Sequence, residues 1–129
     1  MTGGIICASE LQKEESTMQK EKVIQIFESF FGRNSNYVVY AYLKNGITGN
    51  NIANMNLKNR EIEERECFLR VSWDENKHLG IYMHNFSIHY DEVISCYEEV
   101  DEYGSQSICV VFKNGIVVTF ECCGEPMEK

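Results

Sequence analysis

At 129 residues, of which 43% are hydrophobic and 25% charged, the chain has the size and composition of a single globular domain. Its formal net charge of −8 argues against direct binding to nucleic acid, which requires clustered Lys and Arg. No apolar run approaches the roughly 20 residues that span a membrane, and the first residues lack the basic start and apolar stretch of a signal peptide. We therefore expect a cytoplasmic protein that does not associate with membranes.

The sequence predicts one α+β domain over residues 9–123, with a flexible tail at residues 1–8 and a flexible C-terminus at residues 124–129. A helix is expected within residues 9–31, because apolar side chains recur there at helical spacing. Gly32 is expected to end this helix. The apolar stripe should pack on one face of a sheet, and it consists of Val23, Ile24, Phe27, Phe30 and Phe31.

Antiparallel strands joined by short turns are predicted for most of the remaining chain. The expected strands are residues 37–43, 47–52, 67–73, 79–84, 92–100, 107–113 and 116–122. Residues 49–66 are Asn-rich and then acidic, and they are compatible with either a short helix or a long loop. Together these elements predict a helix packed on an antiparallel, curved sheet of about five to seven strands or on a small open barrel.

The C-terminal hairpin turns at Asn114-Gly115, a dipeptide that suits a two-residue type I′ turn. The same Lys-Asn-Gly-Ile sequence occurs at residues 44–47 and 113–116, which we attribute to shared turn chemistry. A two-residue turn places Val111 opposite Val118. Both faces of the ribbon are then apolar, whereas a half-exposed antiparallel ribbon alternates with polar residues.

A ribbon that is apolar on both faces is expected to be covered on both. The helix and the core cover one face, and either another layer of the same chain or a second subunit covers the other. We therefore predict a homo-oligomer, most simply a homodimer. Its interface would include Ile108, Val110, Phe112 and Val117.

The sequence contains none of the nucleotide-binding or catalytic motifs GxxxxGK(S/T), GxGxxG, GxSxG and HExxH. Its histidines are His78, His84 and His89, and a metal site would need a third ligand such as Asp91 or Cys96, which the spacing does not demand. We therefore expect neither a metal nor a cofactor. Cys96 with His89 is the one nearby pair for nucleophilic catalysis. The six cysteines lie mostly in apolar segments and are expected to be reduced thiols.

Acidic clustering is the strongest functional indication. Six acidic residues fall within residues 91–102 with no Lys or Arg between them, namely Asp91, Glu92, Glu98, Glu99, Asp101 and Glu102. They are expected to form either a solvated edge and turn that prevents edge-to-edge strand pairing, or a patch that docks on a basic protein surface.

These features together predict a small acidic, non-enzymatic binding protein of the interaction or inhibitor type, docking on a basic protein surface. Immunity proteins and phage-encoded inhibitors of defence have this general size and charge. Two alternatives stay open. One is a small-molecule or nucleotide-binding module with a pocket at the sheet–helix or subunit interface, and the other is a small enzyme that uses His84, His89 and nearby carboxylates.

Overall fold

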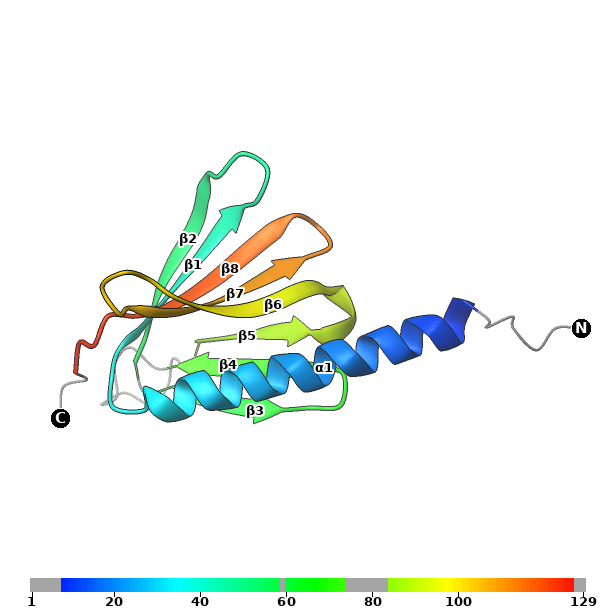
Figure 1. Cartoon of the computed structure of the whole chain (residues 1–129), viewed down its shortest axis with the longest axis horizontal. Helices are drawn as coiled ribbons and strands as arrows, with labels where there is room; N and C mark the ends of the chain where they lie inside the picture. Colours follow the sequence, from blue (N-terminus) through cyan, green and yellow to red (C-terminus); the bar gives the residue numbers. More distant parts are fainter. Residues whose placement is uncertain (1–7, 59, 74–83, 127–129) are drawn as a thin grey trace, which may run out of the picture.

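The computed structural model describes residues 8–58, 60–73 and 84–126, with side chains from residue 19 onward. One helix, α1 (Ala8–Arg33), packs against antiparallel strands, which confirms the predicted α+β class (Figure 1). Within these ranges, no helix combines the length and the apolar character needed to cross a membrane.

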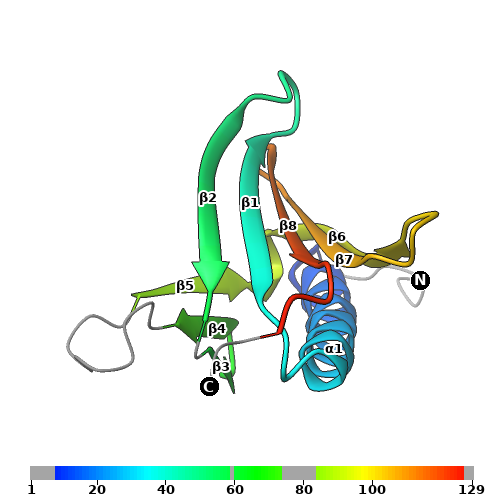
Figure 2. The ribbon, with the colours of Figure 1, turned by 90° about the vertical axis from the view of Figure 1, so that its left-hand side faces the viewer.

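The strands of the described chain form two sheets, whereas the sequence predicted one. The larger sheet has the order β2-β1-β8-β7-β6, the smaller has the order β3-β4-β5, and no barrel closes among these strands. Viewed along the helix, the β1–β2 hairpin extends away from α1 and from the smaller sheet (Figure 2). The elements after α1 are β1 (Val39–Asn45), β2 (Asn51–Leu57), β3 (Glu61–Glu64), β4 (Phe68–Trp73), β5 (His84–His89), the 3-10 helix η1 (Tyr90–Glu92), β6 (Val93–Val100), β7 (Gln106–Phe112) and β8 (Ile116–Cys122).

Aromatic rings from α1 and from both sheets meet at Phe120 of β8. The Phe120 ring centroid lies 5.2 Å from that of Phe27 and 5.8 Å from that of Phe31, both on α1. On the other side, the Phe120 centroid lies 5.7 Å from that of Phe86 on β5. Aromatic pairs at such spacings contribute about 0.5–1.5 kcal/mol each beyond the apolar area that they bury. The apolar stripe predicted for the helix is therefore part of the core.

The helix continues through Gly32 to Arg33, contrary to the prediction that Gly32 ends it. The backbone N–H and the side-chain amide of Asn34 both donate to the carbonyl of Phe30, at 3.1 and 2.8 Å. Because Asn34 satisfies this terminal carbonyl, the chain needs no left-handed glycine at position 32.

The loop of the β7–β8 hairpin has three residues, which corrects the predicted two-residue turn. The N–H of Gly115 donates to the carbonyl of Phe112 at 3.0 Å, and Gly115 has a φ of 88°. This is the geometry of a type I turn followed by a left-handed residue, and glycine adopts that conformation most readily. The predicted register is therefore wrong by one residue, because Val111 pairs with Val117 and not with Val118.

This register changes which residues of the hairpin a second subunit could meet. A shift by one residue exchanges the two faces of a strand. Ile108 and Val110 are fully buried in the core, and Phe112 packs at its margin. Of the four residues predicted at an oligomer interface, only Val117 lies on the opposite, half-exposed face of the sheet.

The sequence left a helix or a loop open for residues 49–66. Of these, residues 51–57 form β2 and residues 61–64 form β3. In β2, Leu57 is fully buried and Met55 packs against the core. Asn54 and Asn56 alternate with them on the other face. Such alternation is typical of a strand with one covered face.

The end of the described chain pairs with the start of β1. The N–H of Val38 donates to the carbonyl of Glu125 at 2.8 Å, and Tyr37 forms an antiparallel bridge with Pro126. Residues 125 and 126, which fall in the C-terminus predicted to be flexible, thus take part in backbone pairing.

Alanine substitutions at two glycines should change stability in opposite directions. A Cβ at position 46 would lie 2.7 Å from the carbonyl oxygen of Gly115, so Gly46→Ala should lower the free energy of unfolding by about 1–3 kcal/mol. A Cβ at position 32 would meet no atom within 4 Å, so Gly32→Ala should raise it by about 0.5–1 kcal/mol, because alanine is the better helix residue. Urea unfolding followed by circular dichroism measures both changes, and a loss at position 32 or no change at position 46 would contradict this packing.

Candidate functional site

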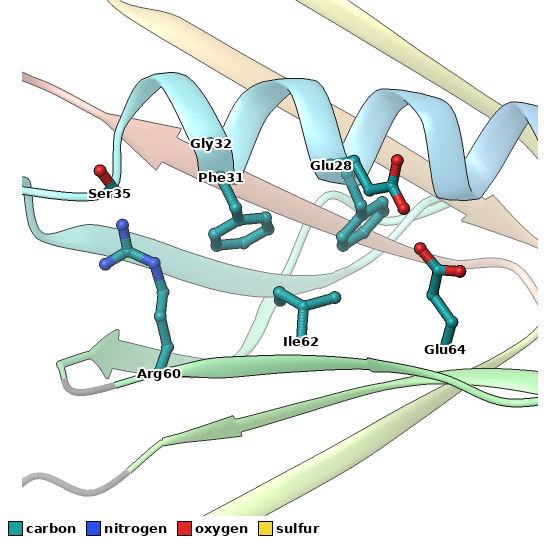
Figure 3. Close-up of a pocket in the computed structure, with 8 residues that line it drawn as sticks. Glu28, Phe31, Gly32, Ser35, Arg60, Ile62 and Glu64 are labelled. Atoms are coloured by element: carbon teal, nitrogen blue, oxygen red, sulfur yellow. The ribbon is translucent and has the colours of Figure 1, made fainter.

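A cavity of about 430 Å³ lies between α1 and β3 (Figure 3). The helix supplies residues that recur about one turn apart and the strand supplies alternate residues, because these positions point to the same side. The other two residues of β3, Glu61 and Glu63, therefore point away from the cavity. The lining consists of Phe27, Glu28, Phe31, Gly32, Ser35, Arg60, Ile62 and Glu64.

The middle of the cavity is apolar. Phe27 and Phe31 stack with ring centroids 5.7 Å apart, and Ile62 packs against the same core from β3. Both phenylalanines also contact Phe120. The apolar wall is therefore held in place by the central aromatic cluster, and it is suited to contact the apolar body of a ligand.

Two carboxyl groups face each other at one end of the cavity. Figure 3 shows Glu28 on α1 and Glu64 on β3 pointing toward one another. A hydrogen bond with the Glu28 side chain raises the pKa of Glu64, burial and the charge of Glu28 raise it further, and Lys20 lowers it. A hydrogen bond between two carboxyl groups requires a proton on one of them, so the two groups share one proton while this hydrogen bond exists.

Tyr90 and Lys20 border the carboxyl end of the cavity. The Lys20 ammonium lies 5.7 Å from the centroid of the Tyr90 ring, and the Tyr90 hydroxyl donates to the carbonyl of Arg65 at 3.3 Å. Burial, and next the charge of Glu64, raise the pKa of Tyr90. The surroundings of Glu64 thus include one cation, one neutral hydroxyl and the carboxyl group of Glu28.

Arg60 forms the opposite end of the cavity. Its guanidinium donates to the carbonyls of Tyr37 at 2.7 Å, of Leu57 at 3.2 Å and of Asn34. It also lies 5.3 Å from the centroid of the Phe31 ring. Burial lowers the pKa of Arg60, but a guanidinium stays protonated in proteins. The cavity therefore has a positive end and an acidic end on either side of an apolar middle.

The six acidic residues predicted as a partner-binding patch form two separate groups. Asp91 and Glu92 lie in η1, before β6. The other four lie at the far end of β6 and in the turn that follows. Strand β6 has eight residues, which places the two groups roughly 25 Å apart.

Two members of the predicted patch have internal partners. Glu98 forms an ion pair with Arg33 at the end of α1. The carboxylate of Asp101 accepts the backbone N–H groups of Tyr103 and Ser105, each at 2.9 Å, and so shapes the β6–β7 turn. The exposed members that remain for a partner are Asp91, Glu92, Glu99 and Glu102.

His84 and His89 lie at opposite ends of β5 and, by strand alternation, on opposite faces. Both are exposed, and each packs on an aromatic ring of β4, His84 on Trp73 at 5.7 Å and His89 on Phe68 at 5.3 Å between centroids. His78 and most of the strand predicted after it lie outside the described residues. In the part of the chain that is described, no group of three or more His, Cys, Asp or Glu side chains is placed to hold a metal ion.

Cys96 is fully buried in β6, and burial raises the pKa of its thiol to about 12. Near neutral pH it is a thiol and not the thiolate that a nucleophile requires. Among the described residues the cysteines are free thiols, and they are Cys67, Cys96, Cys109, Cys122 and Cys123.

One face of the larger sheet, here called the open face, lies opposite the side that packs on α1. Tyr40 on this face donates to the carboxylate of Glu125, and this hydrogen bond is the main cause that raises the pKa of Tyr40 to about 12. The open face mixes aromatic, apolar, polar and charged side chains. It includes Tyr40, Tyr42, Lys44, Tyr97, Glu99, Cys109, Val111, Val117, Thr119 and Glu121.

The sequence did not single out Glu28 or Arg60 as site residues, and Glu64 was noted only within the acidic end of residues 49–66. Glu28 fell on the polar side of the predicted helix, and Arg60 and Glu64 fell in the segment that was left as helix or loop. The alternation of Ile62 and Glu64 was the one available indication, because a strand there would point both side chains to the same side.

Comparison of the chain with models of protein families, with curated proteins and with solved structures finds no match. Function therefore has to be inferred from the chemistry and geometry of the residues themselves.

Removing the charge of Glu64 should stabilise the protein near neutral pH. Because the folded state raises the pKa of Glu64, it holds this proton more tightly than the unfolded chain does, and stability falls as the pH rises through the raised pKa. Glu64→Gln should therefore unfold at a higher temperature than the wild type at about pH 7, and the difference should vanish below about pH 4, where glutamates are protonated in both states. Glu61→Gln, on the other face of β3, is the matched control, and an equal gain in both variants would contradict the facing pair.

Proposed function

We propose that the protein is a small acidic binding protein without enzymatic activity that docks on the basic surface of a protein partner, as an interaction or inhibitor protein. The observation that supports this proposal is the set of exposed side chains along β6 and the turn after it, here called the β6 edge. Its apolar members are Ile94, Val100 and Tyr103, exposed to 54%, 65% and 86%. Its acidic members are Asp91, Glu92, Glu99 and Glu102.

The β6 edge combines the features of a recognition surface. At its far end, the exposed Val100 and Tyr103 are neighbours in sequence of the exposed Glu99 and Glu102, and protein interfaces likewise combine apolar side chains with a polar rim. Strand β6 is an edge of the larger sheet, and an edge strand presents backbone groups to a partner. One of these groups, the carbonyl of Ile94, already accepts a hydrogen bond from the Gln19 side chain, at 2.7 Å. With a net charge of −8, the protein would also attract a basic partner at long range.

Charge reversal at the β6 edge should weaken binding to the partner. Affinity capture from a lysate of the cells that make the protein, followed by mass spectrometry, supplies candidate partners, and calorimetry with the purified candidate gives the affinity. Glu99→Lys with Glu102→Lys should lower that affinity about tenfold or more at low ionic strength. These residues avoid Glu98 and Asp101, whose internal contacts would confuse the result.

The matched control for this reversal is Glu61→Lys with Glu66→Lys, two exposed residues of β3 and the following turn that change the net charge by the same amount. The control should lose far less affinity. Equal losses would show that only net charge matters, and no loss in the Glu99 and Glu102 variant would rule out the β6 edge.

A second candidate function is supported by the cavity between α1 and β3. Its position corresponds to the sheet–helix pocket expected of a small-molecule-binding module. Its acidic end, at Glu28 and Glu64, would repel the phosphates of a nucleotide, which favours a small molecule of another class. The two candidates involve different surfaces, so they can be tested separately.

We further propose that two copies of the chain pair through the open face. The half-exposed Tyr42, Val111 and Val117 make this face more apolar than a fully solvated one. Light scattering after size exclusion should then give a dimer at micromolar concentration, and Val117→Lys should shift it to a monomer that keeps the far-ultraviolet circular dichroism of the folded wild type. A wild-type protein that is strictly monomeric would exclude the dimer.

A further inference from the structure

We propose that the cavity between α1 and β3 binds a small organic ammonium ion with an apolar body, with the cation held between Glu28 and Glu64 and the body packed on Phe31 and Ile62. The ligand class assigned here rests on the small-molecule function proposed above. It does not depend on the β6 edge or on the oligomeric state.

The cavity has the size of a small-molecule site. Its volume of about 430 Å³ falls within the roughly 300–1,000 Å³ of typical ligand pockets. Phe31 and Ile62 provide the apolar contacts, with the fully buried Phe27 packed behind them, and all three are fixed by the core rather than by a loop. Polar groups stand only toward the two ends, which is the arrangement that orients a ligand.

The facing carboxyl groups favour a cation over a neutral or anionic ligand. When both are ionised, Glu28 and Glu64 repel each other, and a bound ammonium would replace this repulsion by charge-assisted hydrogen bonds. An ammonium has three N–H donors and no acceptor, which suits an end of the cavity made of acceptors.

A metal ion is a poor fit to the same groups. Calcium takes about six to eight oxygen ligands and magnesium requires about six in near-octahedral geometry. The cavity offers two carboxylates, those of Glu28 and Glu64, beside an apolar wall. These provide fewer oxygen ligands than either ion takes.

Arg60 at the other end determines the orientation of the ligand. Its positive charge disfavours a second cation there, and it favours a neutral or negative end. The cavity should therefore prefer a monocation whose ammonium points to Glu28 and Glu64, and it should reject a diamine of the same length.

Binding should displace the proton that the two carboxyl groups share. The other titratable groups near the pair are Lys20 from α1 and Tyr90 from η1, with Arg60 across the cavity. The pKa of Tyr90 is raised, so its hydroxyl stays neutral near neutral pH. Protonation of the carboxyl pair opposes binding of a cation, so the affinity for an ammonium ion should rise as the pH rises through the raised pKa of Glu64.

Three probes of matched shape test this ligand class: 2-phenylethylamine as the cation, 2-phenylethanol as the neutral molecule and phenylacetate as the anion. Each is titrated into the full chain, and binding is followed by NMR at the backbone amides of Phe31 and Ile62. The amine should bind about 10- to 100-fold more tightly than the alcohol, and the anion should bind most weakly. The affinity of the amine should increase as the pH rises through the raised pKa of Glu64.

Glu64→Gln should lower the affinity for the amine about tenfold or more and leave the affinity for the alcohol unchanged. Glu61→Gln should change neither, because its side chain points away from the cavity. Thermal unfolding of both variants confirms that they fold.

Equal affinities for amine and alcohol, or an amine affinity that Glu64→Gln leaves unchanged, would overturn the ligand class while leaving a small-molecule site. Absence of binding by all three probes at millimolar concentration would overturn the small-molecule function, and the ligand class with it.

Discussion

The contacts of the Phe120 ring are the interaction on which the rest of the structure depends. Strand β8 occupies the middle of the larger sheet, and from there Phe120 reaches Phe27 of the helix and Phe86 of the smaller sheet, at centroid separations of 5.2 and 5.7 Å. One side chain thus fixes the helix and both sheets relative to one another. Removal of a buried phenylalanine costs about 3–5 kcal/mol, which is a large part of the roughly 5–15 kcal/mol that stabilises a typical domain.

The cavity is a consequence of this arrangement. Because Phe27 and Phe31 turn toward Phe120, the orientation of α1 is fixed, and Glu28 is placed on the side that faces β3. Strand alternation brings Glu64 to the same gap. Two facing carboxyl groups oppose folding near neutral pH, and proteins keep such local conflicts mainly where function needs them. The charges of the β6 edge do not oppose folding in this way, because they are exposed to solvent. They would suit the proposed basic partner, which is attracted at long range.

The features that depend on local periodicity could be predicted from the sequence. The stripe that includes Phe27 and Phe30 could be predicted from its helical spacing, and both residues are buried in the structure. The hairpin faces could not be predicted, because Asn-Gly fits both a two-residue and a three-residue loop, and the choice moves Ile108 and Val110 from the outside to the core. The return strand of the first hairpin was predicted at residues 47–52, whereas β2 spans Asn51–Leu57, because asparagines fill the open face of β2 in place of β-branched residues. The cavity was missed because its two carboxyl groups are distant in sequence and meet only through tertiary packing.

The most direct test of this account is a carbon-13 NMR titration of the side-chain carboxyl groups of Glu28 and Glu64 in the full chain. If the two face each other as described, the pKa of Glu64 lies above the ordinary value of a glutamate, and Glu28→Gln moves it back toward that value. An ordinary pKa for Glu64 in the wild type, unchanged in the Glu28→Gln variant, would contradict the facing pair and with it the proposed ammonium site.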